Sequence, residues 1–208
     1  MARTGIRAII FDVGRVLVRL DLRRAQTGLA NGSRLSPEEV WSAIEKDPRW
    51  KDWQEGHVSP TDWHLNLCTR LGIRLSFDDF VRTWNSVVDP HPIHPDSLFA
   101  TLSKKYRLAL LSNTDPIHVP YLEQTYSFYQ YFPKAVRVYS CVAGVCKPDP
   151  LVFRQALNAC KVNAAQAVYI DDIAAFADAA RTLGMQGIHY QSPEQMRSEF
   201  ARLDITGQ

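Results

Sequence analysis

Polar side chains that could do chemistry follow directly after short apolar runs of this chain. The runs cover residues 6–11, 107–111 and 167–170, and the polar groups that follow them are Asp12, Ser112, Asn113, Asp171 and Asp172. Short apolar runs rich in β-branched residues are typical of strands buried on both faces. In an open parallel sheet, ligands bind outside the carboxyl ends of the strands. We therefore expect these side chains at one edge of a sheet, joined there by Lys147, which follows a weaker run at 135–139.

The residue types at this edge indicate phosphoryl transfer. Carboxylates from different strands repel each other, and a hard divalent cation with oxygen ligands, such as Mg²⁺, relieves that repulsion. The Ser112 hydroxyl and the Lys147 ammonium suit a phosphoryl group, since one is a donor and the other a point cation. Asp12 can then attack phosphorus as a nucleophile and form an aspartyl-phosphate.

The second half of the chain alternates strands with helices. Helical patterns cover residues 97–105, 151–160, 173–183 and 193–203, and a last strand covers 187–190. Gly184 stands where the end of a helix favours a left-handed residue. This alternation predicts an α/β fold with a Rossmann-like parallel sheet as its core and helices on both faces.

Residues 20–90 contain no convincing strand and predict a different unit. Capping residues precede four helical stretches, at Asp21, Ser36, Ser59 and Ser76. All five tryptophans fall in this region, and packing inside a small helical unit explains them better than a sugar-stacking platform. We predict a small all-helical cap, residues 19–91, inserted after the first strand into a core formed by 1–18 and 92–208. The proline-rich segment 89–95 is expected to be a stiff return linker.

Four motifs, in this order along the chain, resemble those of the haloacid dehalogenase (HAD) superfamily. They are Ile9-Ile-Phe-Asp12-Val-Gly14, Leu110-Leu-Ser112-Asn113, Lys147-Pro148 and Tyr169-Ile-Asp171-Asp172. One apolar run that ends in Asp is common, whereas four such motifs in order are specific. The insert lies where that family has its helical C1 cap. The Asp-Val-Gly and Leu-Ser-Asn-Thr sequences and the stretch 55–59 are similar to the sugar-phosphatase-like branch, such as bacterial glucose-1-phosphatases.

The resemblance implies a catalytic role for four residues. Asp12 would be the nucleophile. Ser112 and Lys147 would hold the phosphoryl oxygens, and Asn113 would support them. These roles together would form the catalytic set of a phosphatase.

The resemblance also implies a Mg²⁺ site, with two departures from the usual pattern. Its ligands would be Asp12, the main-chain carbonyl of Gly14, Asp172 and, nearby or through water, Asp171. Typical phosphatases of the family have a second Asp, the general acid and base, where this chain has Gly14, although the sugar-phosphatase-like branch shares the glycine. Phe176 stands where an Asp or Asn often lies near the metal. If the cap supplies the missing proton donor, the first candidates are His57, Glu55 and Asp52.

The sequence thus predicts a Mg²⁺-dependent phosphatase of a small phosphomonoester, for example a sugar phosphate. One alternative is a 2-haloacid dehalogenase, in which Asp12 attacks carbon and no metal is needed. Another is a catalytically weak HAD-fold binding or regulatory protein, which Gly14 and Phe176 would support. The paired Asp171 and Asp172 favour the phosphatase over the dehalogenase.

Composition excludes several other classes of protein. The chain has 208 residues with 46% hydrophobic and 22% charged residues, which is typical of a globular protein. The net charge is +2 without a basic run, so we expect neither a nucleic acid nor a membrane as partner. The apolar run at the start is too short for a signal peptide. The four cysteines lack a CxxC pattern, which favours free thiols and a cytoplasmic location.

The expected partner is therefore a small phosphorylated metabolite, and the protein is expected to be a monomer or a homodimer. The aromatic run 121–132 bears on this choice. We expect it to pack under the edge of the sheet, with a homodimer contact as the alternative.

Overall fold

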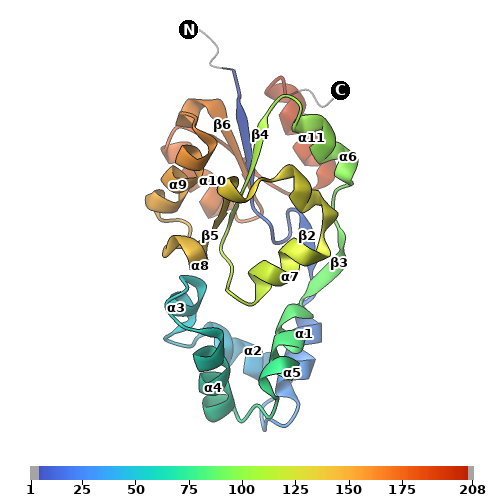
Figure 1. The fold of residues 1–208 in the computed structure, drawn as a ribbon, viewed down its shortest axis with the longest axis vertical. Helices are drawn as coiled ribbons and strands as arrows, with labels where there is room; N and C mark the ends of the chain where they lie inside the picture. Colours follow the sequence, from blue (N-terminus) through green and yellow to red (C-terminus); the bar gives the residue numbers. More distant parts are fainter. Residues whose placement is uncertain (1–4, 206–208) are drawn as a thin grey trace.

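The structure is a computed structural model that describes residues 5–205. Its core is a five-stranded parallel sheet in the order β5-β4-β1-β6-β7. The strands are β1 (Ala8–Phe11), β4 (Arg107–Ser112), β5 (Arg137–Tyr139), β6 (Ala167–Asp171) and β7 (Gln186–His189). In this register Phe11 lies between Leu110 and Ile170. With its flanking helices, the sheet confirms the predicted Rossmann-like α/β fold (Figure 1).

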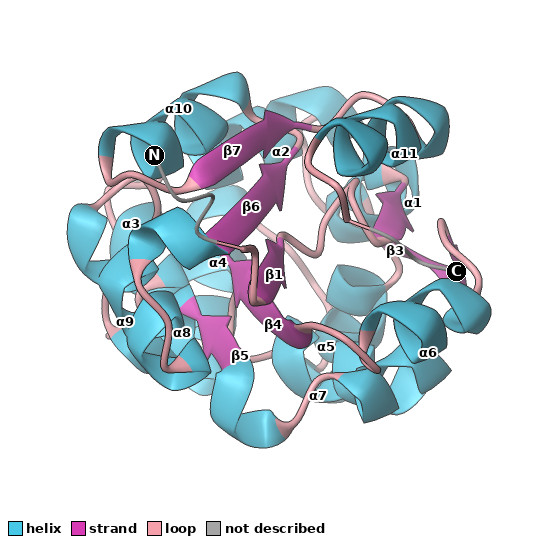
Figure 2. Cartoon of the chain, turned by 90° about the horizontal axis from the view of Figure 1, so that it is seen from above, coloured by secondary structure: helices cyan, strands magenta, loops and turns pink. Residues whose placement is uncertain are grey.

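Both faces of the sheet are buried because successive residues of each strand point to opposite faces. In β1, Ile9 and Phe11 join one hydrophobic cluster, while Ala8 and Ile10 join the other. The Ile9 face packs against α6 (Asp96–Leu102) and α11 (Pro193–Arg202), and the Ile10 face packs against α9 (Pro150–Cys160) and α10 (Ala174–Thr182), as Figure 2 shows.

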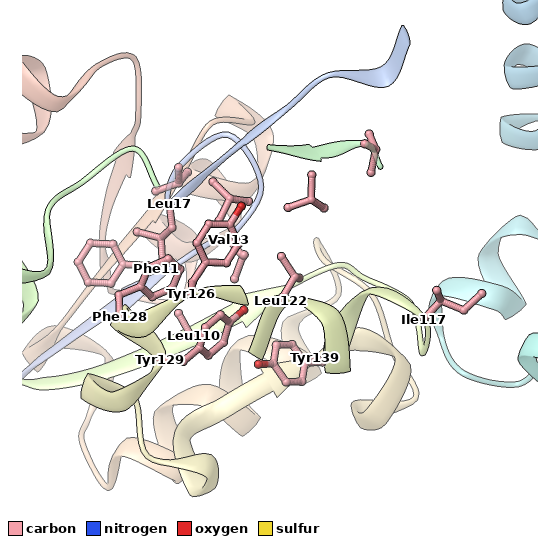
Figure 3. Close-up of a cluster of buried hydrophobic side chains, with 14 of the residues drawn as sticks. Phe11, Val13, Leu17, Leu110, Ile117, Leu122, Tyr126, Phe128, Tyr129 and Tyr139 are labelled. Atoms are coloured by element: carbon pink, nitrogen blue, oxygen red, sulfur yellow. The ribbon is translucent and has the colours of Figure 1, made fainter. Parts of the chain in front are cut away.

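The aromatic run covers the same face as Ile9 and Phe11. It spans α7 (His118–Thr125) and the 3₁₀ helix η1 (Ser127–Tyr131). Tyr126, Phe128 and Tyr129 gather around Phe11 in Figure 3, and all are buried. The expected packing of this run is confirmed. Its alternative use in a homodimer contact stays a prediction.

Five helices lie between β1 and β4 in sequence and gather at the end of the molecule away from the chain termini (Figure 1). They are α1 (Leu22–Ala30), α2 (Pro37–Glu45), α3 (Trp50–Gln54), α4 (Pro60–Leu71) and α5 (Phe77–Asn85). Each of the four predicted capping residues accepts a hydrogen bond from the first turn of its helix, which fixes where α1, α2, α4 and α5 begin. Trp53 and Trp63 are fully buried with stacked rings, so for these two the predicted role in packing is confirmed.

The region between the sheet and these helices contains a two-stranded ribbon that the sequence did not predict. Strand β2 (Val18–Leu20) pairs antiparallel with β3 (Val88–Pro92), so the expectation of no strand in residues 20–90 was wrong. Prolines within β3 hide its strand pattern, and they are tolerated because a ribbon strand has a free edge. The predicted domain boundaries fall within this ribbon.

The remaining elements are short. They are the 3₁₀ helices η2 (Lys134–Val136) and η3 (Ala164–Gln166) and the helix α8 (Ser140–Ala143). All four cysteines are free, as predicted. Within residues 5–205, none of the helices is both long and apolar enough to cross a lipid bilayer.

Candidate active site

The carboxyl edge of the sheet brings together side chains from three adjacent strands. Asp12 follows β1, Ser112 ends β4, and Asp171 ends β6. Lys147 reaches the same edge from the loop between α8 and α9. All four of these residues are buried, whereas Asp172, the next residue after β6, is partly exposed. The motifs, which are far apart in the sequence, are thus brought together at one edge of the sheet.

A single ammonium group links the two buried carboxylates of this cluster. Lys147 Nζ lies 2.8 Å from Asp12 Oδ1 and 2.7 Å from Asp171 Oδ2. Asp172 Oδ2 is 3.9 Å from the exposed guanidinium of Arg15. Carboxylate oxygens of Asp12, Asp171 and Asp172 all lie within 4.8 Å of one another. Three hard oxygen donors at this spacing fit the ligand preference of Mg²⁺.

The pKa values at the edge reflect burial and crowding of like charges. Burial raises the pKa of Asp12 to about 6, against the opposing effect of the Lys147 ammonium and with added repulsion from Asp171. Burial and Asp171 also raise the pKa of Asp172. Burial alone would lower the pKa of Lys147, but its two carboxylate partners outweigh that effect and raise it. A further cation at this edge would therefore favour the ionised carboxylates.

Lys147 is held by contacts from both sides. The Asn113 side chain accepts a hydrogen bond from the Lys147 amide at 2.8 Å and donates one to its carbonyl at 3.1 Å. Because its amide group is used in this way, Asn113 orients Lys147, in keeping with a supporting role. The ammonium also lies 5.7 Å from the ring centroid of Tyr169 and 5.1 Å from that of Phe176. Phe176, the second departure from the family pattern, thus contacts the lysine cation through its ring.

The two acidic residues at the end of β6, Asp171 and Asp172, differ in how many hydrogen bonds and ion pairs their carboxylate oxygens already make. Asp171 Oδ1 accepts a hydrogen bond from the Ile173 amide at 2.8 Å, and Oδ2 accepts from both Lys147 and the Tyr169 hydroxyl. Within residues 5–205, the carboxylate of Asp172 makes one ion pair, with Arg15 at 3.9 Å. Asp172 therefore has more capacity to bind a metal. The sequence analysis missed that Tyr169 holds Asp171. Side chains alternate between the two faces of a strand, so Tyr169, two residues before Asp171, was expected on the same face.

Gly14 marks the place where the general acid of the family is missing. A Cβ atom built on this glycine would lie 3.2 Å from Leu20 Cδ1, and its φ is not in the left-handed region. The backbone therefore does not require glycine here. The space beside Gly14 is bordered by an apolar side chain of β2.

A cavity of about 170 Å³ begins at this edge and extends between the sheet and the cap. It starts at Gly14, Ser112 and Asn113. Most of its wall is carbon, from Val13, Val18, Leu20, Leu22, Trp41, Trp50, Trp84, Val87, Val88 and Leu122. The polar remainder is Gln54, Thr114, Asp115 and His118. Three of the five tryptophans thus serve as cavity wall, which the sequence analysis did not predict.

Asp115 and His118 form a buried ion pair that fixes one wall of the cavity. His118 Nδ1 is 2.6 Å from Asp115 Oδ2, which also accepts a hydrogen bond from the Trp84 indole at 3.0 Å. His118 Nε2 lies 3.2 Å from the Trp84 carbonyl oxygen. Burial lowers the pKa of His118, but Asp115 outweighs this and raises it overall. Burial opposes ionisation of Asp115 too, yet His118 and Trp84 leave its pKa below the ordinary value.

This pair joins the core to the cap, because Trp84 belongs to α5 and its partners lie at the start of α7. The sequence analysis missed it. A sequence signal was available, because Asp is favoured as a capping residue and Asp115 stands just before the residues that form α7. In the structure it accepts hydrogen bonds from the amides of Ile117 and His118, in the turn that leads into α7.

The acidic and imidazole groups suggested as proton donors from the cap lie elsewhere. Asp52, Glu55 and His57 have ligand atoms within 4.8 Å of one another. Glu55 Oε1 accepts a hydrogen bond from the Cys146 amide at 3.2 Å, so this group lies beside the loop that carries Lys147. Asp52, Glu55 and His57 are not among the described residues that line the cavity.

Three relatives align with most of this chain. The mouse protein "Acyl-CoA dehydrogenase family member 10" is 28% identical over 213 residues, which cover 95% of this chain but 19% of that protein, so the chain spans about a fifth of its length. D-ribitol-5-phosphate phosphatase of Bacteroides thetaiotaomicron is 20% identical over 201 residues, covering 94% of this chain and 97% of the relative. A sesquiterpene phosphatase of Aspergillus oryzae is 23% identical over 192 residues, covering 89% and 90% respectively.

Solved structures and a family model extend the comparison. A HAD family enzyme from Bacteroides thetaiotaomicron, in complex with magnesium and inorganic phosphate, superposes with a TM-score of 0.82 at 23% identity. The superposition covers 94% of this chain and 100% of that one, and it shows a shared fold. The model of haloacid dehalogenase-like hydrolases matches residues 6–184. With its four motifs gathered at one sheet edge, the chain belongs to the haloacid dehalogenase-like hydrolases.

Proposed function

We propose that this hydrolase is a Mg²⁺-dependent phosphatase that cleaves a small phosphomonoester through an aspartyl-phosphate on Asp12. One observation carries the proposal: oxygens of Asp12, Asp171 and Asp172 converge within 4.8 Å at the sheet edge whose neighbouring residues, Gly14 and Ser112, line a cavity. Two of the relatives are named as phosphatases, and the structural neighbour binds magnesium and inorganic phosphate, which supports the same chemistry.

In the proposed first step, a carboxylate oxygen of Asp12 forms a bond to phosphorus while the bond between phosphorus and the leaving oxygen breaks. Lys147 donates two of its three protons to Asp12 and Asp171, so its third proton is left for a phosphoryl oxygen. The Ser112 hydroxyl donates to another. When bound among the three carboxylates, Mg²⁺ supplies positive charge against the phosphoryl oxygens.

Water then attacks the aspartyl-phosphate, releasing inorganic phosphate and restoring the Asp12 carboxylate. The leaving alkoxide must take a proton when it departs. Gly14 has none to give, and both ring nitrogens of His118 are engaged by Asp115 and Trp84. We infer that water supplies this proton.

The proposal is tested by turnover of p-nitrophenyl phosphate with Mg²⁺ and with a chelator. We expect hydrolysis that chelation abolishes and Mg²⁺ restores. Dehalogenation of a 2-haloacid that persists in chelator would support the dehalogenase alternative instead. Mg²⁺ binding without turnover of any phosphate would support a binding or regulatory protein.

A binding measurement separates the two acidic residues. Because Asp172 has the freer oxygens, Asp172→Asn should weaken Mg²⁺ affinity more than Asp171→Asn, as titration calorimetry would show. A stronger loss in the Asp171 variant would reverse the proposed ligand order.

A further inference from the structure

The cavity beside the phosphoryl edge offers few polar groups to a ligand. The Asn113 amide is used by the Lys147 backbone, and the two ring nitrogens of His118 are used by Asp115 and Trp84. The indole nitrogens of Trp84 and Trp41 donate to Asp115 and Glu45, so they point to protein partners. The wall is therefore carbon over most of its area.

We propose that this cavity binds the leaving group of the substrate, and that the leaving group is apolar and about the size of a benzene ring. The inference rests on the proposed phosphatase function, since Gly14 and Ser112 join the cavity to the phosphoryl edge. Apolar cavities of roughly 150 Å³ accommodate benzene, and this one measures about 170 Å³. A sugar phosphate, the example given by the sequence analysis, fits this wall poorly.

A polyol would lose its hydrogen bonds with water and find few partners here. With Ser112 engaged by the phosphoryl group, the polar side-chain groups left on the described wall are those of Gln54 and Thr114 and the indole N–H of Trp50. An apolar pocket typically discriminates against one unmatched hydroxyl by about 10²-fold, so several hydroxyls exceed what these three side chains can offset.

The aromatic part of the wall is held in a fixed arrangement. The Trp84 ring centroid lies 6.0 Å from that of Trp41 and 6.4 Å from that of Trp50. The Asp115–His118 pair holds Trp84 through both its indole nitrogen and its carbonyl oxygen. Leu20 closes the end beside Gly14. These surfaces can contact an aromatic or branched aliphatic group on several sides.

The first experiment compares kcat/KM for benzyl phosphate and glycerol 3-phosphate. Both are esters of primary alcohols, so their leaving groups differ little in chemistry and the ratio reports recognition. We expect benzyl phosphate to be preferred by at least ~10²-fold. Equal rates, or a preference for the polyol ester, would overturn the inference.

Acetyl phosphate and p-nitrophenyl phosphate separate failure of this inference from failure of the proposed function. If both are hydrolysed with Mg²⁺ while benzyl phosphate has no advantage, only the apolar leaving group is wrong. If none of the four phosphates is hydrolysed, the proposed function and the inference both fail.

A pair of variants tests the wall itself. Leu22→Gln places an amide at the cavity, whereas Leu65→Gln makes the same change on α4 at a side chain that is 62% exposed. We expect the Leu22 variant to lower the ratio of kcat/KM for benzyl phosphate over acetyl phosphate by at least about tenfold. The Leu65 variant should keep the wild-type ratio. An unchanged ratio in the Leu22 variant would contradict the assignment.

Inhibition by phosphonates gives a readout that needs no turnover of the probe. Benzylphosphonate should inhibit hydrolysis of p-nitrophenyl phosphate with a far lower inhibition constant than methylphosphonate, because only the benzyl group fills the cavity. Equal inhibition constants would overturn the inference.

Discussion

The carboxyl edge and the cavity wall are adjacent and both largely buried, yet they present different chemical groups to a ligand. The edge concentrates charge, with three carboxylates grouped together, two of which contact one lysine ammonium. Most polar groups of the wall are hydrogen-bonded to other protein groups, so the surface that faces the cavity is mainly carbon. The edge residues belong to the sheet core, whereas α1, α2, α3 and α5 supply much of the wall. Under the proposed function, the core would hold the reacting phosphoryl group, and the cap would select the leaving group.

Replacing the proposed nucleophile should cause the largest loss of activity at the carboxyl edge. Asp12→Asn keeps the size of the side chain but cannot attack phosphorus, so we expect turnover to fall by at least ~10⁴-fold. Single-turnover phosphate release measures the loss, and circular dichroism checks the fold. Wild-type turnover in the folded variant would remove Asp12 from the mechanism.

Replacing the central cation should cost stability as well as activity. Lys147→Met leaves Asp12 and Asp171 buried without their shared partner, a change that typically destabilises by about 3–5 kcal/mol. Urea denaturation without metal measures this, with Lys104→Met as an exposed control. Mg²⁺ should recover more of the free energy of unfolding in the Lys147 variant than in the wild type. An equal effect of Mg²⁺ on both proteins would argue against a shared carboxylate site.

A carboxylate at position 14, where the carboxyl edge meets the cavity, would test whether a general acid is missing there. Gly14→Asp should fit after a small movement of Leu20, since the new Cβ lies 3.2 Å from its terminal methyl. General acid catalysis contributes roughly 10²–10⁴-fold, and the gain should appear with benzyl phosphate more than with phenyl phosphate. Single-turnover rates over a series of alkyl and aryl phosphates measure this. If the wild-type rate is indifferent to the pKa of the leaving group, a proton donor is already in place.

The smallest expected effect concerns the Asp115–His118 ion pair in the cavity wall. Because the pKa of His118 is raised in the folded protein, its contribution to stability is present below the unfolded pKa of about 6.5 and is lost as pH rises through the folded pKa. His118→Gln should lower the free energy of unfolding by about 1.5–3 kcal/mol near pH 6 and by less in more alkaline buffer. Urea denaturation across this pH range checks the trend. A deficit that grows with pH would contradict the ionised pair.

The two regions were not equally predictable from sequence. Asp12, Ser112 and Asp171 each end a short apolar run, so strand periodicity and the rule for parallel sheets were enough to bring them to one edge. The wall has no such signature, since its side chains come from several helices, a ribbon and a loop whose packing is decided by tertiary contacts. The ribbon escaped prediction because Pro90 and Pro92 obscure the pattern of β3. Lys147 was predicted to hold phosphoryl oxygens, and its bridging of two carboxylates emerged only from the folded geometry.

The β2–β3 ribbon has a mechanical consequence. Both connections to the cap run through it, tied by hydrogen bonds such as Ile93 N to Leu17 O at 2.8 Å and Asp21 N to Val87 O at 2.8 Å. Two connections that are hydrogen-bonded to each other form one line of attachment, and a body attached along one line rotates mainly about that line. In a rotation about this line, Leu20 and Val88 in the ribbon would move little, whereas α3, which contacts α8 on the side away from the ribbon, would move more (Figure 1). A rotation that moved α3 away from α8 would break the contact from Ser140 Oγ to Gln54 O, at 2.7 Å, and would open the cavity on the side of Gln54.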